Sequence, residues 1–351
     1  MNSIPPPLPL APTATPPPSS RRARTWVVLI IAVLALLLAV SVMMNAGLST
    51  ALSQKLKHRG QLHTQAVDEF PSLTEVWSYG SGDAKVARIA VQGMIIRETQ
   101  AGLFATPVNM VDSVLAQIRT AQADPEVRAL IVEVDSPGGG ITASDEIYRA
   151  LNGFRDSDEA RVVVVFMRDL AASGGYYVAM GGDWLIAQPT TVLGSIGVIM
   201  QSINMKGLSE KIGIHDVTIK SGANKDLLNP FTDVDPAQRA LLQQMIDAMF
   251  EHFLGIVQEN RPIPAEDLRK LADGRLFVAP QALDLKLVDQ IGYWEDAMAK
   301  TAELLEVDAI KVVRYEQHID FFTWLTTVKS PLHPSAWMPD ITPRFQYLWN
   351  P

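Results

Sequence analysis

Three short segments contain the residue types that nucleophilic catalysis could use. In the first, Ser173 lies within Ala-Ala-Ser-Gly-Gly-Tyr-Tyr (171–177), after an apolar run and at the start of a helical pattern. A serine among small residues at such a strand-to-helix turn can expose its hydroxyl to substrate, as in a nucleophile elbow, although Gly-x-Ser-x-Gly itself is absent. The simpler interpretation is that Ser173 only caps the helix.

The second segment is the glycine-rich turn Asp-Ser-Pro-Gly-Gly-Gly (135–140), which also follows an apolar run and precedes a helical pattern. Three glycines leave backbone N–H groups free to face an anion, either a phosphate or an oxyanion that develops during a reaction. The spacing does not match the phosphate-loop pattern. A tight structural turn is equally compatible with these residues.

The third segment contains candidates for the general base that a serine nucleophile needs. None of the six histidines lies in a motif-like setting: His58, His63, His215, His252, His318 and His333. A lysine can serve if burial favours its neutral amine. The candidates lie in Lys-Ser-Gly-Ala-Asn-Lys-Asp (220–226), where either lysine alone would be interpreted as surface charge.

Alternating strands and helices must position these segments. The runs are continuously apolar, which is typical of parallel strands covered on both faces, so the sequence predicts an α/β domain. Strand and helix pairs are expected at 86–91 and 111–121, 129–134 and 144–151, and 162–167 and 174–180. Further strands are expected at 184–187, 197–200 and 217–220, followed by a long amphipathic helix at 236–258.

The chain divides into five predicted parts: a disordered Pro-rich cytoplasmic tail (1–25), a transmembrane anchor (26–48), a stalk (49–83), the catalytic domain (84–314) and a C-terminal tail (315–351). The anchor rests on the uncharged run 26–44, whose 19 residues suit the ~30 Å core of a bilayer. Its length favours an uncleaved anchor over a signal peptide. Arg21, Arg22 and Arg24 favour an N-terminus in the cytoplasm.

Composition narrows the function classes further. The 351 residues carry a formal charge of −8 and no basic block in the body, which argues against nucleic acid as a main partner. Without cysteine there is neither a disulfide framework nor a thiolate metal site.

Five segments occur in the order found in the signal peptide peptidase A family, which this chain resembles over residues 85–300. They are Ser-Pro-Gly-Gly-Gly (136–140), Ala-Ala-Ser-Gly-Gly-Tyr-Tyr (171–177), Gly-Ser-Ile-Gly-Val-Ile (194–199), Lys-Ser-Gly-x-x-Lys-Asp (220–226), and Ala-Asp-Gly-Arg-Leu-Phe with Leu-Val-Asp-Gln-Ile-Gly (272–292). The single copy of this set is similar to the short, single-domain form. The resemblance implies a Clp protease/crotonase-like α/β fold behind an N-terminal transmembrane helix.

The resemblance also implies roles for individual residues. Ser173 matches the nucleophile, Lys225 the general base and Ser195 the residue that orients the lysine. Backbone N–H groups of Gly139 and Gly174 match the oxyanion donors, with Gly138 or Gly140 possible if the turn is shifted. No metal or cofactor is implied.

The implied activity is that of a membrane-anchored serine endopeptidase which degrades remnant signal peptides, cutting next to small or aliphatic side chains. The expected location is the bacterial inner membrane, single-pass, with the catalytic domain on the extracytoplasmic side. A homo-oligomer with sites shared between subunits is expected. The alternatives are an acyl-CoA hydratase-like enzyme, which the predicted anchor disfavours, and an inactive membrane scaffold, which the intact Ser173, Ser195 and Lys225 disfavour.

Overall fold

The computed structural model describes residues 26, 28–43, 73–97, 109–316 and 345–348. It divides into two units, residues 1–64 and residues 65–351. In the first unit, residues 28–43 are helical. Among the residues that the structure describes, no helix combines the length and the apolar character needed to cross a membrane. The Pro-rich tail and part of the expected anchor lie outside the described residues.

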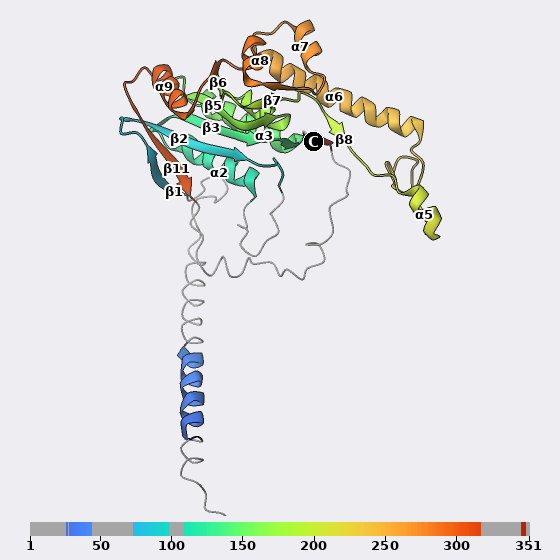
Figure 1. Ribbon diagram of the computed structural model, residues 1–351, viewed down its shortest axis with the longest axis horizontal. Helices are drawn as coiled ribbons and strands as arrows, with labels where there is room; N and C mark the ends of the chain where they lie inside the picture. The colour runs from blue at the N-terminus through green and yellow to red at the C-terminus, as the bar shows by residue number, and fades with distance from the viewer. Residues whose placement is uncertain (1–25, 27, 44–72, 98–108, 317–344, 349–351) are drawn as a thin grey trace, which may run out of the picture. The chain divides into compact units, whose positions relative to one another are not determined.

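A nine-stranded sheet with the order β1-β11-β2-β3-β5-β6-β10 organises the second unit, and β7 and β9 extend it from β5 (Figure 1). Its central strands run parallel, and β1 is antiparallel to β11. The strands are β1 (Thr74–Tyr79), β2 (Ala84–Gln92), β3 (Val127–Ser136), β5 (Val162–Ala172), β6 (Trp184–Ala187), β7 (Val192–Gly194), β9 (Leu276–Val278), β10 (Gln290–Ile291) and β11 (Ile310–Glu316).

Helices cover both faces of this sheet. Leu130 packs into the cluster formed with α2 (Met110–Ala123), α3 (Ile141–Asp156) and α4 (Gly174–Ala179), whereas its neighbour Ile131 packs into the cluster formed with α9 (Trp294–Leu304). Both side chains are fully buried. Because successive residues of a strand point to opposite faces, burial on both faces requires continuously apolar strands. The α/β prediction is confirmed.

A second, three-stranded sheet lies at the end of the first. Its order is β4 (Gly138–Gly140), β12 (Phe345–Leu348) and β8 (Ile199–Met200), with the C-terminal strand β12 in the middle and antiparallel to both neighbours. A strand near the C-terminus of the sequence therefore pairs with the glycine turn. The larger sheet likewise includes β1, which the sequence analysis assigned to the stalk.

After β8 the chain leaves the body as an arm, residues 201–235, that contains α5 (Lys206–Ile212) (Figure 1). The chain returns through α6 (Pro236–Asn260), and α7 (Ala265–Leu271) and α8 (Ala279–Asp284) complete the helices described here. The prediction of a strand at 217–220 is wrong, because these residues have no regular structure. Val217 and Ile219 are 85% and 97% exposed, and a β-strand needs a paired neighbour.

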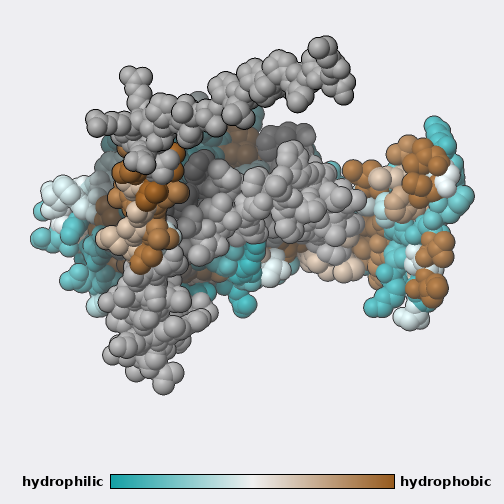
Figure 2. Space-filling model, turned by 90° about the horizontal axis from the view of Figure 1, so that it is seen from below, coloured by the Kyte–Doolittle hydropathy of each residue, from teal (hydrophilic) through white to brown (hydrophobic). Residues whose placement is uncertain are grey.

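The arm has an apolar surface. Its large side chains that are more than half exposed are Ile203, Leu208, Ile212, Ile214, Val217 and Ile219. Figure 2 shows hydrophobic residues gathered at the end of the molecule where α5 lies. Several large apolar side chains exposed on one segment are typical of an interaction site.

Candidate active site

Two sharp turns meet at the carboxyl ends of neighbouring strands. β3 leads into the glycine turn and β5 leads into Ser173, and Ser136 of β3 lies opposite Ala171 of β5. Ligand sites of parallel sheets form where adjacent strands end at the same edge. The sheet therefore brings together two of the three segments that the sequence analysis selected.

Ser173 has a backbone conformation that serine rarely adopts, with φ 53° and ψ −113°. Its N–H donates to the carbonyl of Gly194 at 2.7 Å, and its carbonyl accepts from the N–H of Tyr177 at 2.9 Å. These bonds fix the residue as the N-cap of α4, with 1% of its surface exposed. Such strain persists only when the surroundings determine it, and it is concentrated at functional sites.

Most N–H groups of the glycine turn already have partners. Gly138 donates to the Oγ of Ser136 at 3.0 Å, and Gly140 donates to the carbonyl of Ile95 at 2.9 Å. The carbonyl of Gly138 accepts from the N–H of Ile95 at 2.9 Å. Because backbone groups alternate in direction along a strand, the N–H and carbonyl of Gly139 face the other way, toward β12. Gly139 is therefore the residue of the glycine turn whose N–H points to the side of β12.

The two turns touch through their backbones. A Cβ added to Gly138, whose φ is 97°, would lie 2.6 Å from the nitrogen of Gly174. A Cβ on Gly174 would lie 3.1 Å from the nitrogen of Gly139 and 2.5 Å from the Oγ of Ser144. Only glycine permits this approach. The contact brings the N–H groups of Gly139 and Gly174 to one point beside Ser173.

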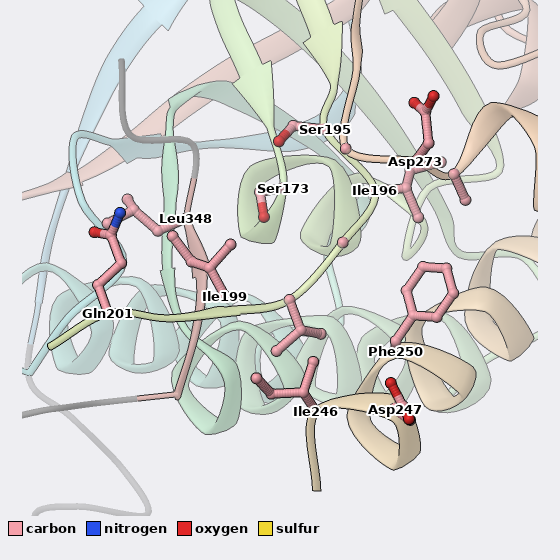
Figure 3. Close-up of a pocket in the computed structure, with 14 residues that line it drawn as sticks. Ser173, Ser195, Ile196, Ile199, Gln201, Ile246, Asp247, Phe250, Asp273 and Leu348 are labelled. Carbon is pink, nitrogen blue, oxygen red and sulfur yellow. The ribbon is translucent and has the colours of Figure 1, made fainter. Parts of the chain in front are cut away.

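A cavity of about 460 Å³ opens beside Ser173 (Figure 3). Its lining consists of Ser173, Ser195, Ile196, Gly197, Val198, Ile199, Gln201, Ile246, Asp247, Phe250, Ala272, Asp273, Gly274 and Leu348. Ser195 has φ 50°, is 7% exposed and donates its N–H to the carbonyl of Arg275 at 2.8 Å. Ser173 and Ser195, which lie 22 residues apart in the sequence, therefore face the same space.

The ionisable residues of this lining are two carboxylates. Hydrogen bonds from Arg275 lower the pKa of Asp273 to about 2, so this side chain stays ionised at neutral pH. Figure 3 shows the Asp273 carboxylate turned away from Ser173. Among the described residues, the lining includes neither histidine nor lysine.

Lys225 does not line the cavity. It lies exposed on the arm, where its N–H donates to the carbonyl of Gly222 at 3.2 Å. The other lysine of this segment, Lys220, pairs with Asp226 at 2.7 Å. Within the described residues, one chain thus brings together Ser173, Ser195, Gly139 and Gly174 but leaves Lys225 apart.

Sequence reasoning missed β12 as part of the site. Leu348 lines the cavity, and Tyr347 is fully buried opposite Gly139. The aromatic residues Phe345 and Tyr347 alternate with a polar residue, which is a strand signal that the sequence contains. The strand is short, and nothing local indicates its distant partners.

The chain is similar to several known peptidases. The profile of Peptidase family S49 matches residues 155–308, which include Ser173, Ser195 and Lys225. A putative signal peptide peptidase SppA of Enterococcus faecium is 33% identical over 253 residues, covering 72% of this chain and 73% of the relative. A putative protease of Synechocystis sp. is 37% identical over 238 residues, covering 68% and 80%.

Two further similarities are more limited. Protease 4 of Salmonella typhi is 31% identical over 211 residues, covering 60% of this chain and 32% of that protein. Among solved structures, a point mutant of ClpP1 from Listeria monocytogenes matches with a TM-score of 0.40 and 16% identity, covering 60% of this chain and 93% of that one.

Two of these relatives are 33% and 37% identical to this chain and are matched over more than two thirds of their length. They establish the family, and the strained serine beside the glycine turn is consistent with it. The chain belongs to peptidase family S49, the family of signal peptide peptidase A, and is a serine peptidase.

Proposed function

We propose that this serine peptidase uses Ser173 as nucleophile and Lys225 of a neighbouring copy as general base. The observation that carries the proposal is the buried, strained Ser173 that lines a cavity beside the N–H groups of Gly139 and Gly174. A nucleophile and convergent oxyanion donors are what acyl transfer requires.

In the proposed reaction, the Oγ of Ser173 bonds to the carbonyl carbon of a peptide bond while its proton passes to the neutral amine of Lys225. Gly139 and Gly174 donate to the oxyanion. The C–N bond then breaks, and the leaving amine takes the proton back from the lysine. Water, activated by the same lysine, hydrolyses the ester and regenerates Ser173.

The position of Lys225 supports a shared site. A lysine works as base only as a neutral amine, which burial favours, yet Lys225 is exposed in one chain. It lies on the arm whose apolar side chains are also exposed, among them Val217 and Ile219. Packing the arm against a second copy would bury both the apolar surface and the lysine. Ser195, in the same cavity as Ser173, would then orient the amine.

We expect the substrates to be remnant signal peptides. The support comes from the relative in Enterococcus faecium, which is named a putative signal peptide peptidase. The apolar run 26–44 would hold the enzyme at the bacterial inner membrane, where such peptides remain after secretion. The arginines that precede the run favour a peptidase domain on the extracytoplasmic side.

Replacing the nucleophile tests the chemistry directly. A fluorophosphonate probe should label the wild-type chain, and Ser173→Ala should abolish both labelling and peptide hydrolysis, because the variant lacks the hydroxyl that forms the covalent bond. Ser157→Ala is the matched control, since this hydroxyl caps α3 by bonding the carbonyl of Phe154 outside the cavity. Undiminished labelling of Ser173→Ala would rule out Ser173 as the nucleophile.

Replacing a glycine tests the oxyanion donors. In Gly138→Ala the new Cβ meets the backbone of Gly174 at a φ of 97°, so the turns must separate. We expect a loss of roughly 10²–10³ in kcat, as for a lost oxyanion donor. Gly153→Ala in α3 meets nothing within 4 Å and should leave kcat unchanged while raising stability by about 1 kcal/mol. Equal kcat in both variants would contradict the role of the turn.

Co-expression tests whether sites are shared. Ser173→Ala and Lys225→Ala should each be inactive, whereas mixed oligomers should regain part of the hydrolysis, because some interfaces pair an intact serine with an intact lysine. Lys225→Arg should not substitute for the lysine, since guanidinium stays protonated. Mixed oligomers that demonstrably form and remain inactive would refute a shared site and leave the nucleophile assignment intact.

Protease accessibility tests the membrane topology. Protease added to intact spheroplasts should digest the peptidase domain while a cytoplasmic marker survives. If the domain is degraded only after lysis, the proposed orientation is wrong.

A further inference from the structure

Tyr177 joins the serine turn to the helix that follows the glycine turn. Its backbone N–H donates to the carbonyl of Ser173 at 2.9 Å and closes the first turn of α4. Its hydroxyl donates to the carboxylate of Asp145 at 2.7 Å, and Asp145 lies near the start of α3, which begins directly after Gly140. One side chain therefore bridges the two segments that meet at the candidate site.

The bridge is important because of the residues at the start of each helix. Gly139 lies two residues before α3, and Gly174 is the first residue of α4. A Cβ added to Gly174 would lie only 3.1 Å from the nitrogen of Gly139. A shift of α4 along α3 would therefore change the separation of the two N–H groups to which we assign oxyanion binding. Such donors act at about 2.7–3.1 Å from the oxyanion, so small shifts matter.

The surroundings of the Tyr177 hydroxyl favour a firm hydrogen bond. The side chain is fully buried, with its ring 5.0 Å from that of Phe253 and 5.5 Å from that of Tyr148. Burial, together with the bond to Asp145, raises the pKa of Tyr177 well above its usual range, so the phenol keeps its hydrogen at physiological pH. A hydroxyl that donates to a carboxylate makes a shorter and stronger bond than a neutral pair does.

A third helix meets the same hydroxyl. The phenol oxygen of Tyr177 lies 3.1 Å from Nε2 of His252 in α6. Because the one phenol hydrogen goes to Asp145, Nε2 of His252 supplies the hydrogen of this second contact. The same helix contributes Ile246 and Phe250 to the wall of the cavity. The hydroxyl of Tyr177 therefore connects α3, α4 and α6.

We propose that Asp145 is a positioning residue for the oxyanion donors. Through the hydroxyl of Tyr177 it holds α4 against α3, at the separation at which the N–H groups of Gly139 and Gly174 reach one substrate oxygen. His252 supports the same hydroxyl from α6. This inference rests on the proposed function, because the separation affects catalysis only if these N–H groups bind the oxyanion.

Removing one hydroxyl tests the proposal in the full-length enzyme. Tyr177→Phe keeps the ring and its packing. We expect kcat to fall roughly 10- to 100-fold while KM changes by less than about 2-fold, because a misplaced donor weakens binding of the transition state and not of the substrate. Equal kcat in Tyr177→Phe and wild type, or a raised KM at unchanged kcat, would overturn the proposal.

The neighbouring residue offers the matched control. Tyr176 is also fully buried, and its hydroxyl donates to the carbonyl of Leu287 at 2.8 Å. Tyr176→Phe should therefore lower the thermal stability about as much as Tyr177→Phe and leave kcat unchanged. An equal loss of kcat in both variants would show that the effect is general destabilisation, and would refute the positioning role.

A transition-state mimic gives a second readout. A peptide boronate places an oxygen where the oxyanion develops, so its Ki should rise in Tyr177→Phe by the factor that kcat/KM falls. A structural role that only reduces the amount of folded enzyme leaves Ki unchanged. An unchanged Ki would therefore overturn the proposal.

Replacing the carboxylate tests the partner of the hydroxyl. Asp145→Ala should lower kcat as far as Tyr177→Phe does, and the double variant should fall no further, because both changes break one hydrogen bond. Asp145→Asn keeps an acceptor oxygen and should retain more of kcat than Asp145→Ala. Glu146→Ala, which changes the next residue of α3 and removes a partner of Arg97, should leave kcat unchanged. Additive losses in the double variant would contradict the coupling.

The failure of this inference is distinguishable from the failure of the proposed function. Hydrolysis that depends on Ser173 but keeps a normal kcat in Tyr177→Phe refutes this inference alone. Hydrolysis that survives Ser173→Ala refutes the proposed function, and this inference with it.

Discussion

The backbone contact between the glycine turn and the serine turn is the constraint on which the site depends. No side-chain atom fits between Gly138 and Gly174, so the approach of the two turns is made by main chain alone. The contact exists because β3 and β5 are adjacent and parallel, and end at the same edge. The strain at Ser173 follows, since its hydroxyl must face the cavity while its N–H bonds Gly194. Donors fixed in this way need no rearrangement when charge develops on a substrate, which is the physical basis of oxyanion stabilisation.

The arm carries both Lys225 and exposed apolar surface, which is the physical basis of the proposed shared site. Six large apolar side chains on it are more than half exposed, and burying each fully would contribute about 1.5–3 kcal/mol. Their exposure disfavours the isolated chain and favours assembly. If the same packing event buries Lys225, assembly creates the environment in which a lysine can act as base. Activity and association would then depend on one interface.

Local signals were enough to predict the α/β domain and the two turns. Continuous apolar runs such as residues 129–134 indicate strands covered on both faces, and glycines mark the turns that follow them. Contacts between distant segments were not predictable in the same way. Val217 and Ile219 have β propensity, but the arm offers them no pairing strand, so the expected strand is absent. The pairing of Tyr347 with Gly139 joins residues more than 200 positions apart, and no pattern near either one reveals it. The sequence could not place Lys225 relative to Ser173 for the same reason. A separation of 52 residues along the chain sets no useful limit on the distance between them.

The most direct test of the account is a structure of the assembled enzyme with a peptide boronate bound. The account predicts a covalent bond from boron to the Oγ of Ser173 and a boronate oxygen within hydrogen-bonding distance of the nitrogens of Gly139 and Gly174. A boronate attached to another residue, or one whose oxygens face away from both glycines, would contradict it.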